Sequence, residues 1–273
     1  MRTSGRVNEN IAPLSEETQL ASLRIDRVSV AFGGIQALSE VSFDVEDGQI
    51  CGLIGPNGAG KSTLFNCLSR LYPVGGGSIA LHGRELTTMP RHRIARLGIG
   101  RTFQNLALFK TMSVRENVLI GARCKSRSGF MTTALRLPSV HQAERRAEDL
   151  AASLIAFLSL EDVAGRRVAD LPFGSQKRVE LARALATEPT LLLLDEPACG
   201  LNHAEIDNLA TLVRAIRDQF KVTVLLVEHH MGLVMGISDK IVALNFGRKI
   251  AEGTPAEVRR HPDVIRAYLG AAA

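Results

Sequence analysis

The sequence predicts an α/β protein built on a phosphate-loop core. An apolar run of strand length, residues 49–54, leads into a glycine-rich loop, and a helix-compatible run follows it. Two further apolar runs, 191–194 and 222–227, alternate with segments of helical length. Such runs are typical of parallel strands covered on both faces by helices. Shorter alternating segments near the N-terminus predict a small antiparallel sheet laid against this core.

The N-terminal part divides into a lead and the start of one domain. Residues 1–21 are polar without periodicity, so we expect a disordered lead before a single domain over residues 22–270. Alternating strands are expected at 23–30, 41–45 and 78–81.

A helical subdomain is expected as an insertion over about residues 112–172. Ser113 and Glu116 have the spacing of a capping box that opens a helix. A Ser/Thr/Gly-rich segment, 126–138, is expected to form a loop before an amphipathic helix over 141–160. We interpret the charges of that helix as a solvated face.

The C-terminal part is expected to complete the core. Helices are predicted over 175–187 and 204–218, and a hairpin is predicted from strands 240–244 and 249–251. Thr254 is expected to cap a last helix, because proline and glutamate follow at the first and third helical positions.

The glycine-rich loop carries the strongest chemical pattern. Its spacing is G-x-x-x-x-G-K-[ST] between a strand and a helix, which predicts a nucleotide-phosphate site. Glycines allow successive backbone N–H groups to point at phosphate oxygens, the lysine reaches the β- and γ-phosphates, and the serine hydroxyl binds Mg²⁺. The predicted binding residues are Gly55, Pro56, Asn57, Gly58, Ala59, Gly60, Lys61, Ser62 and Thr63.

Two adjacent carboxylates follow the strand over 191–194, which we expect to lie beside the phosphate strand. Asp195 is predicted to hold Mg²⁺ and Glu196 to polarise an attacking water. A further small-residue turn, residues 171–176, leads into a helix. This turn is either a second anion site or an ordinary helix cap, and its residues alone leave both readings open.

Composition limits the function classes. The chain has 273 residues and a mild net charge of +5, which suits a membrane surface as well as nucleic acid. No Trp and only two Tyr make aromatic stacking of nucleic-acid bases unexpected. The four cysteines lack metal or redox spacing, so we expect reduced and mostly buried thiols. We expect no membrane span, because no apolar run approaches the ~20 residues that one needs.

The order of motifs resembles the ATP-binding cassettes of ABC transporters over residues 22–270. The motifs are the phosphate loop, Thr102-Phe103-Gln104-Asn105, the turn at 171–176, the run into Asp195-Glu196-Pro197, and Val227-Glu228-His229. The resemblance implies an ATPase that binds ATP and Mg²⁺ between two cassettes arranged head to tail. It further implies that Gln104 lies near Mg²⁺ and water, that His229 touches the γ-phosphate, and that Phe32 stacks on adenine.

Finer motifs are similar to the cassettes of branched-chain amino-acid importers. They are residues 98–104, 197–202, 228–231 and 262–270. That resemblance implies a cassette at the cytoplasmic face of the membrane, with a second ATPase subunit, two permeases and, indirectly, a periplasmic binding protein as partners. Nucleic acid is not expected as a partner.

The turn at 171–176 departs from the family pattern Leu-Ser-Gly-Gly-Gln. Pro172 stands where the family's serine bonds the γ-phosphate, and Phe173 and Ser175 depart from the pattern at its third and fifth positions. Gly174 and Ser175 are nevertheless expected to face the nucleotide of the mate through the helix N-terminus. Asn202 replaces the aspartate that usually ends the loop after Glu196.

Three alternatives stay open at this stage. One is a related cassette with another cargo, such as lipopolysaccharide export. The second is a nucleic-acid-linked ATPase, although such cassettes typically carry a coiled-coil insertion or occur in tandem. The third is a regulatory module that binds ATP without hydrolysing it, which the departure at Pro172 permits although the intact Lys61, Asp195, Glu196 and His229 argue against it.

Overall fold

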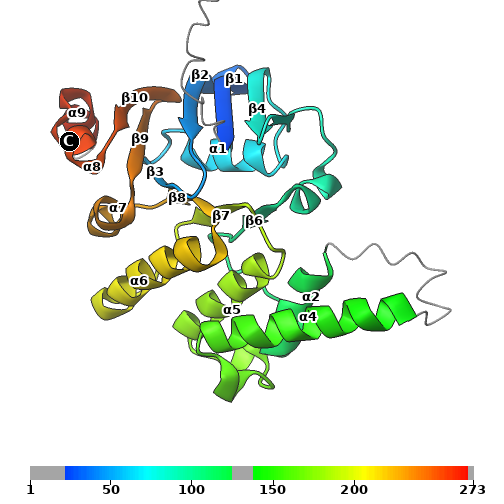
Figure 1. Ribbon diagram of the computed structural model, residues 1–273. Coiled ribbons are helices and arrows are strands. Elements are labelled where there is room, and N and C mark those ends of the chain that lie inside the picture. Colours follow the sequence, from blue (N-terminus) through cyan, green and yellow to red (C-terminus); the bar gives the residue numbers. More distant parts are fainter. Residues whose placement is uncertain (1–21, 125–137, 270–273) are drawn as a thin grey trace, which may run out of the picture.

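The computed structural model describes residues 22–124 and 138–269 and contains two sheets with helices packed around them (Figure 1). The larger sheet has the strand order β10-β9-β3-β8-β7-β6. Its strands are β3 (Ile50–Ile54), β6 (Ile99–Arg101), β7 (Leu191–Asp195), β8 (Thr223–Val227), β9 (Lys240–Asn245) and β10 (Arg248–Gly253). Neighbouring strands are parallel except for the β9–β10 hairpin, as the apolar runs and the turn between them predict.

One expectation about this sheet is wrong. The strand that ends in Asp195 does not lie beside the phosphate strand β3, because β8 is hydrogen-bonded to both and separates them. All three strands are buried and consist mainly of apolar residues, so the apolar pattern places each strand inside the sheet but does not give their order.

The smaller sheet is antiparallel, as expected, with the strand order β2-β1-β4-β5. Its strands are β1 (Leu23–Phe32), β2 (Ile35–Val45), β4 (Gly76–Leu81) and β5 (Arg84–Glu85). Helix α1 (Lys61–Leu68) shares one buried apolar cluster with inward side chains of both sheets. The phosphate loop therefore opens a helix that is held from both sides.

The other helices surround the larger sheet and a second apolar cluster. They are α2 (Val114–Arg123), α4 (Pro138–Phe157), α5 (Phe173–Leu185), α6 (His203–Phe220), α7 (Met231–Ile237), α8 (Pro255–Arg260) and α9 (Pro262–Leu269). Short 3₁₀ turns lie at Arg91–Arg93, Ala95–Leu97, Glu161–Val163 and Val168–Asp170. Figure 1 places α2, α4 and α5 together on the side of the larger sheet away from α1.

Local capping predictions are confirmed. Ser113 opens α2 with Glu116 in a complete capping box, and Thr254 does the same for α8 with Glu257. Helix α5 begins at Phe173, two residues earlier than expected, so residues 173–176, the later part of the turn at 171–176, belong to the helix. The expected lead over 1–21 lies outside the described residues, as does most of the loop expected at 126–138.

Two further findings concern the surface. Cys51 and Cys67 are buried, but Cys124 and Cys199 are exposed, so the expectation of mostly buried thiols is wrong for half of them. Within residues 22–124 and 138–269, no helix has the length and apolar character needed to cross a membrane.

Candidate functional site

The phosphate loop has a backbone that glycine makes possible. Gly55, Gly58 and Gly60 have φ angles of 150°, 80° and 103°. At Gly55 an added Cβ would lie 2.2 Å from the carbonyl oxygen of Leu244 on β9, so a side chain there would overlap the backbone. The loop is therefore packed tightly against the core at its start and is open further along, where Asn57 and Gly58 are exposed.

Lys61 and the first turn of α1 form the cationic part of this site. The Lys61 ammonium donates to the carbonyl oxygens of Gly55 (2.7 Å) and Pro56 (3.0 Å), so it curls back over the loop. Burial lowers its pKa from the ordinary value, and the charge of Glu196 opposes that shift. Gly60 precedes the helix without a side chain to cap it, and Ser62 is exposed in the first turn. The arrangement leaves the helix N-terminus open to an anion.

Three predicted catalytic residues meet at the carboxyl edge of the larger sheet. One carboxylate oxygen of Glu196 accepts a hydrogen bond of 2.7 Å from the Gln104 amide, and the other lies 2.6 Å from Nε2 of His229. Glu196 has a φ of +49°, a strained region for a residue with a side chain. Its backbone N–H donates to Val227 at the end of β8, which holds this conformation.

Asp195 is held by a residue for which the sequence analysis made no prediction. Arg101, the last residue of β6, donates to the Asp195 carboxylate at 2.8 Å. The same guanidinium bonds the Phe65 carbonyl and the Ser69 hydroxyl of the α1 region and lies over the Phe103 ring. Both charged side chains are nearly buried, with 9% and 7% of their area exposed. The pair therefore ties the end of β7 to the phosphate helix.

Glu228 is a second residue that the sequence analysis quoted without a role. It is buried, and its carboxylate accepts hydrogen bonds from the backbone amides of Ala198 (2.6 Å), His229 (2.7 Å) and His230 (3.1 Å). It therefore fixes the loop after Glu196 relative to the loop that carries His229.

Phe32 is half-exposed at the end of β1 and has an aromatic neighbour. Its ring meets the Tyr72 ring edge to face, with centroids 5.0 Å apart and an interplanar angle of 71°. The two rings offer an exposed aromatic surface of the kind on which a planar base could stack. Tyr72 is one of only two tyrosines in the chain, and no motif identified it in advance.

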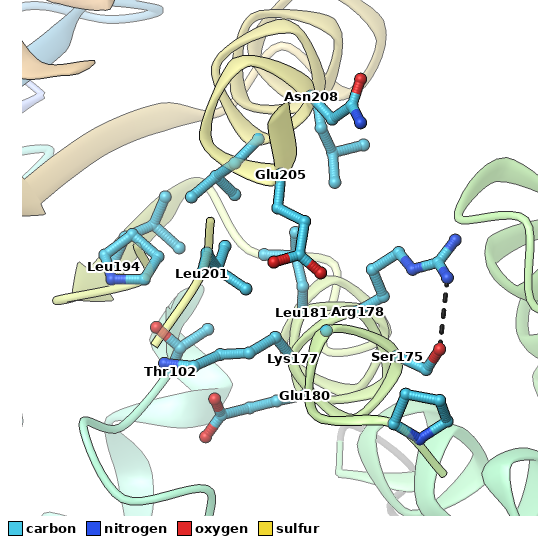
Figure 2. A pocket seen from close by; sticks show the side chains of 15 residues that line it. Thr102, Ser175, Lys177, Arg178, Glu180, Leu181, Leu194, Leu201, Glu205 and Asn208 are labelled. Carbon is cyan, nitrogen blue, oxygen red and sulfur yellow. Dashed lines mark hydrogen bonds between the residues drawn. The ribbon is translucent and has the colours of Figure 1, made fainter. Parts of the chain in front are cut away.

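Gly174 and Ser175 lie elsewhere, at the start of α5. A cavity of about 370 Å³ separates α5 from α6, and Figure 2 shows the Glu205 side chain of α6 directed towards α5 across it. The Ser175 hydroxyl accepts a hydrogen bond from Arg178, 3.3 Å away. Gly174 lies against Glu205 of α6 and near Leu201 of the segment after Glu196, and Figure 1 places α5 apart from α1.

Comparison with known families identifies the pattern as a whole. Residues 38–199 match the family described as ABC transporter, and residues 248–273 match the family described as branched-chain amino acid ATP-binding cassette transporter.

Named relatives match almost the whole chain. The chain is 45% identical to the high-affinity branched-chain amino acid transport ATP-binding protein BraF of Pseudomonas aeruginosa, over 92% of this chain and 98% of BraF. It is 43% identical to LivG of Escherichia coli, which has the same description, over the same shares. Among solved structures, the ADP conformation of an ATP-binding cassette of an ABC transporter is 29% identical with a TM-score of 0.79, covering 92% of this chain and 99% of that one.

Proposed function

This chain belongs to the ATP-binding cassette family of ABC transporters, and on that premise we propose that it powers the import of branched-chain or related amino acids. As a member of that family it binds nucleotide and is an ATPase. The cargo is proposed from the two named relatives, whose descriptions both specify branched-chain amino acid transport, and from the C-terminal match at 248–273.

The observation that supports hydrolysis best is the convergence on Glu196. Its carboxylate lies between the amide of Gln104 and the imidazole of His229, at the end of a buried strand. We assign Glu196 to orient a water and accept its proton during in-line attack on the γ-phosphate. His229 then stabilises the charge on the transferring phosphoryl group, and Gln104 helps to position the attacking water.

ATP is assigned to the phosphate loop, residues 55–63, with Lys61 on the β- and γ-phosphates and Phe32 against adenine. In the structure Lys61 bonds loop carbonyls, so ATP binding requires the ammonium to exchange these acceptors for phosphate oxygens. That exchange favours binding, because a buried ammonium gains more from an anion than from a neutral carbonyl.

The donor set fits Mg²⁺. Ser62, Gln104 and Asp195 offer only oxygen ligands, which a hard cation prefers. Arg101 occupies one carboxylate oxygen of Asp195 and leaves Oδ1 without a hydrogen bond among the described residues. When bound, the metal would neutralise charge on the β- and γ-phosphates, and Asp195 would hold it through a water.

The half of the site that faces the γ-phosphate is proposed to come from a second ATPase subunit. Gly174 and Ser175 stand at the open N-terminus of α5, away from this chain's own phosphate loop. In a head-to-tail pair each such turn would meet the nucleotide held by the mate. Two permease subunits that span the membrane, served by a periplasmic binding protein, would complete the importer, with this chain bound peripherally on the cytoplasmic side.

Substituting Glu196→Gln tests the catalytic assignment. The amide keeps the side-chain shape but cannot accept a proton, so we expect ATP binding to persist while steady-state ATPase activity falls at least about 100-fold. Both are measured on protein copurified with its membrane partners. Near-normal turnover in this variant would remove Glu196 from the role, and turnover stimulated by DNA would contradict the transport assignment.

The cargo is tested separately. Copurified complexes in vesicles should show ATPase activity that rises when a binding protein loaded with leucine, isoleucine or valine is added. Stimulation by a chemically unrelated cargo would leave the ATPase assignment intact and overturn the amino-acid assignment.

A further inference from the structure

The segment that follows Glu196 packs on the turn that departs from the family pattern. We call residues 172–175 the signature turn and residues 197–202 the loop after Glu196. The Phe173 ring lies against Gly200, where an added Cβ would be 2.9 Å from the ring atom Cε1. Gly200 also has a φ of +81°, so both space and backbone conformation require glycine there. Phe173 thus covers this loop directly.

A second contact joins the same two segments. An added Cβ on Gly174 would lie 3.0 Å from Oε1 of Glu205, so the carboxylate sits close against the turn. The other oxygen of Glu205 accepts from the backbone N–H of Asn202, and the Asn202 side chain accepts from Glu205 in return. Figure 2 shows Glu205 reaching from α6 towards α5. The residue that caps α6 together with the end of the loop after Glu196 therefore packs against the turn.

A third contact reaches the catalytic residue itself. The Lys177 ammonium lies 5.5 Å from the centroid of the Phe173 ring and donates to the backbone carbonyl of Glu196 at 3.4 Å. The Cys199 amide donates to the same carbonyl at 3.2 Å. Because Glu196 is in a strained conformation, the groups that bond its backbone help to set where its carboxylate points.

We propose that Phe173 is a positioning residue that couples the two ATP sites of the dimer. It acts through Lys177 and Gly200 on the backbone that carries Glu196. This inference rests on the proposed function, in which the signature turn meets the mate's nucleotide and Glu196 serves the nucleotide of its own chain. Nucleotide bound by the mate would press on the turn, and the three contacts would pass that displacement to Glu196.

The test places nucleotide on one side only. This chain carries Lys61→Ala, which removes its own ATP binding, and is paired with a mate whose phosphate loop is intact, either a second copy or the ATPase chain that copurifies with it. MgATP should then slow hydrogen exchange at the amides of residues 197–202 in the Lys61→Ala chain. Adding Phe173→Leu should abolish the slowing, and Phe173→Tyr, which keeps the ring, should preserve it.

Phe109→Leu is the matched control. Phe109 is also half-exposed, at 49% against 45% for Phe173, and has Arg183 over its ring at 6.0 Å. The Phe109→Leu substitution should leave the slowing of hydrogen exchange by MgATP unchanged. The proposal is overturned if Phe173→Leu responds to MgATP as fully as the parent chain, or if the parent chain shows no response although the mate binds a fluorescent ATP analogue.

Steady-state kinetics gives a second readout with intact phosphate loops. Phe173→Leu should lower the Hill coefficient for ATP towards one while the Kd of the single chain for ATP stays the same. A merely structural role would lower activity in proportion to folded protein and leave the Hill coefficient unchanged. Absence of ATPase activity in the parent protein would instead count against the proposed function.

Discussion

Arg101 and Asp195 show how one buried pair can organise a site. A guanidinium has a fork of donors, and here it serves a carboxylate at the end of β7 and a carbonyl and a hydroxyl at the end of α1. Taking two charges out of water is costly, so the pair is better evidence for fixed geometry than for added stability. Asp195 is thereby held in one orientation before any metal binds.

Removing one partner of this pair should be severely destabilising. Arg101→Met leaves the Asp195 carboxylate buried without its cation, which we expect to cost about 3–5 kcal/mol in the free energy of unfolding. Arg101→Met combined with Asp195→Asn should cost less than the sum of the single changes. Urea unfolding measures all three, and Arg167→Met at the exposed pair with Asp170 should lose less than about 1 kcal/mol. A loss that small for Arg101→Met would contradict the account.

Alanine variants at two glycines of the phosphate loop distinguish the cost of backbone strain from the cost of steric overlap. Gly58→Ala introduces a side chain at a φ of 80° with nothing within 4 Å, so it should cost roughly 1–2 kcal/mol from backbone strain alone. Gly55→Ala adds overlap with the Leu244 carbonyl, so its loss of unfolding free energy should be clearly larger. Chemical denaturation without nucleotide compares the two variants. Equal losses of unfolding free energy would show that the loop backbone shifts to relieve the overlap at Gly55.

Helix α5 supports the segment that carries Gln104. Glu180 is buried on this helix, and one carboxylate oxygen accepts from the backbone amides of Phe103 (3.1 Å) and Ala107 (3.3 Å). Burial raises the pKa of Glu180 above its ordinary value, and the two amides oppose this only in part. The segment between these amides is therefore anchored from the helix that also presents the signature turn.

The raised pKa of Glu180 predicts the sign of a pH dependence. Its contribution to stability is present in full below the ordinary pKa of 4.5 and is lost as pH rises through the higher folded pKa. Glu180→Gln keeps an acceptor and removes the titration. The unfolding free energy of this variant, relative to that of the parent chain, should therefore increase as pH rises above about 4.5. Denaturation at a series of pH values measures the difference.

Glu116 supplies the opposite control. The hydrogen bonds that it accepts from the Ser113 backbone and side chain lower its pKa. Its contribution to stability is therefore present above the unfolded pKa and is lost as pH falls through the folded pKa. The unfolding free energy of Glu116→Gln should accordingly differ most from that of the parent chain near neutral pH. A Glu180→Gln difference that falls as pH rises would contradict the assignment of burial as the dominant cause.

At the scale of elements, local chemistry was predictable and short elements were not. The caps at Ser113 and Thr254 follow from spacing alone, because the bonds that close them lie within four residues. No element was predicted at β6 or α7, which are three and seven residues long, too short for periodicity to identify. The order of β3, β8 and β7 depends on pairing between distant segments, which apolar runs do not encode.

At the scale of the molecule, the chemistry was predictable where motifs are contiguous. The phosphate loop and the Asp195-Glu196 pair stand out by spacing, and the family resemblance added Gln104 and His229. Arg101, Tyr72 and Glu228 contact the site from other elements, so their roles follow only from the fold. The two halves that a phosphoryl transfer needs are separated on this chain, and that separation leads to the last prediction.

A site divided in this way should close only when two chains meet. The phosphate loop lies beside α1, whereas the signature turn lies beside the loop after Glu196, so one chain cannot enclose the γ-phosphate from both sides. Saturating MgATP should therefore convert the Glu196→Gln chain from a species of 29.5 kDa to one of twice that mass, measured by light scattering. Adding Gly174→Val should prevent this, because the larger side chain meets Glu205 at the N-terminus that the nucleotide would approach. A mass that stays at 29.5 kDa with ATP bound would contradict self-association and make a different ATPase chain the required mate.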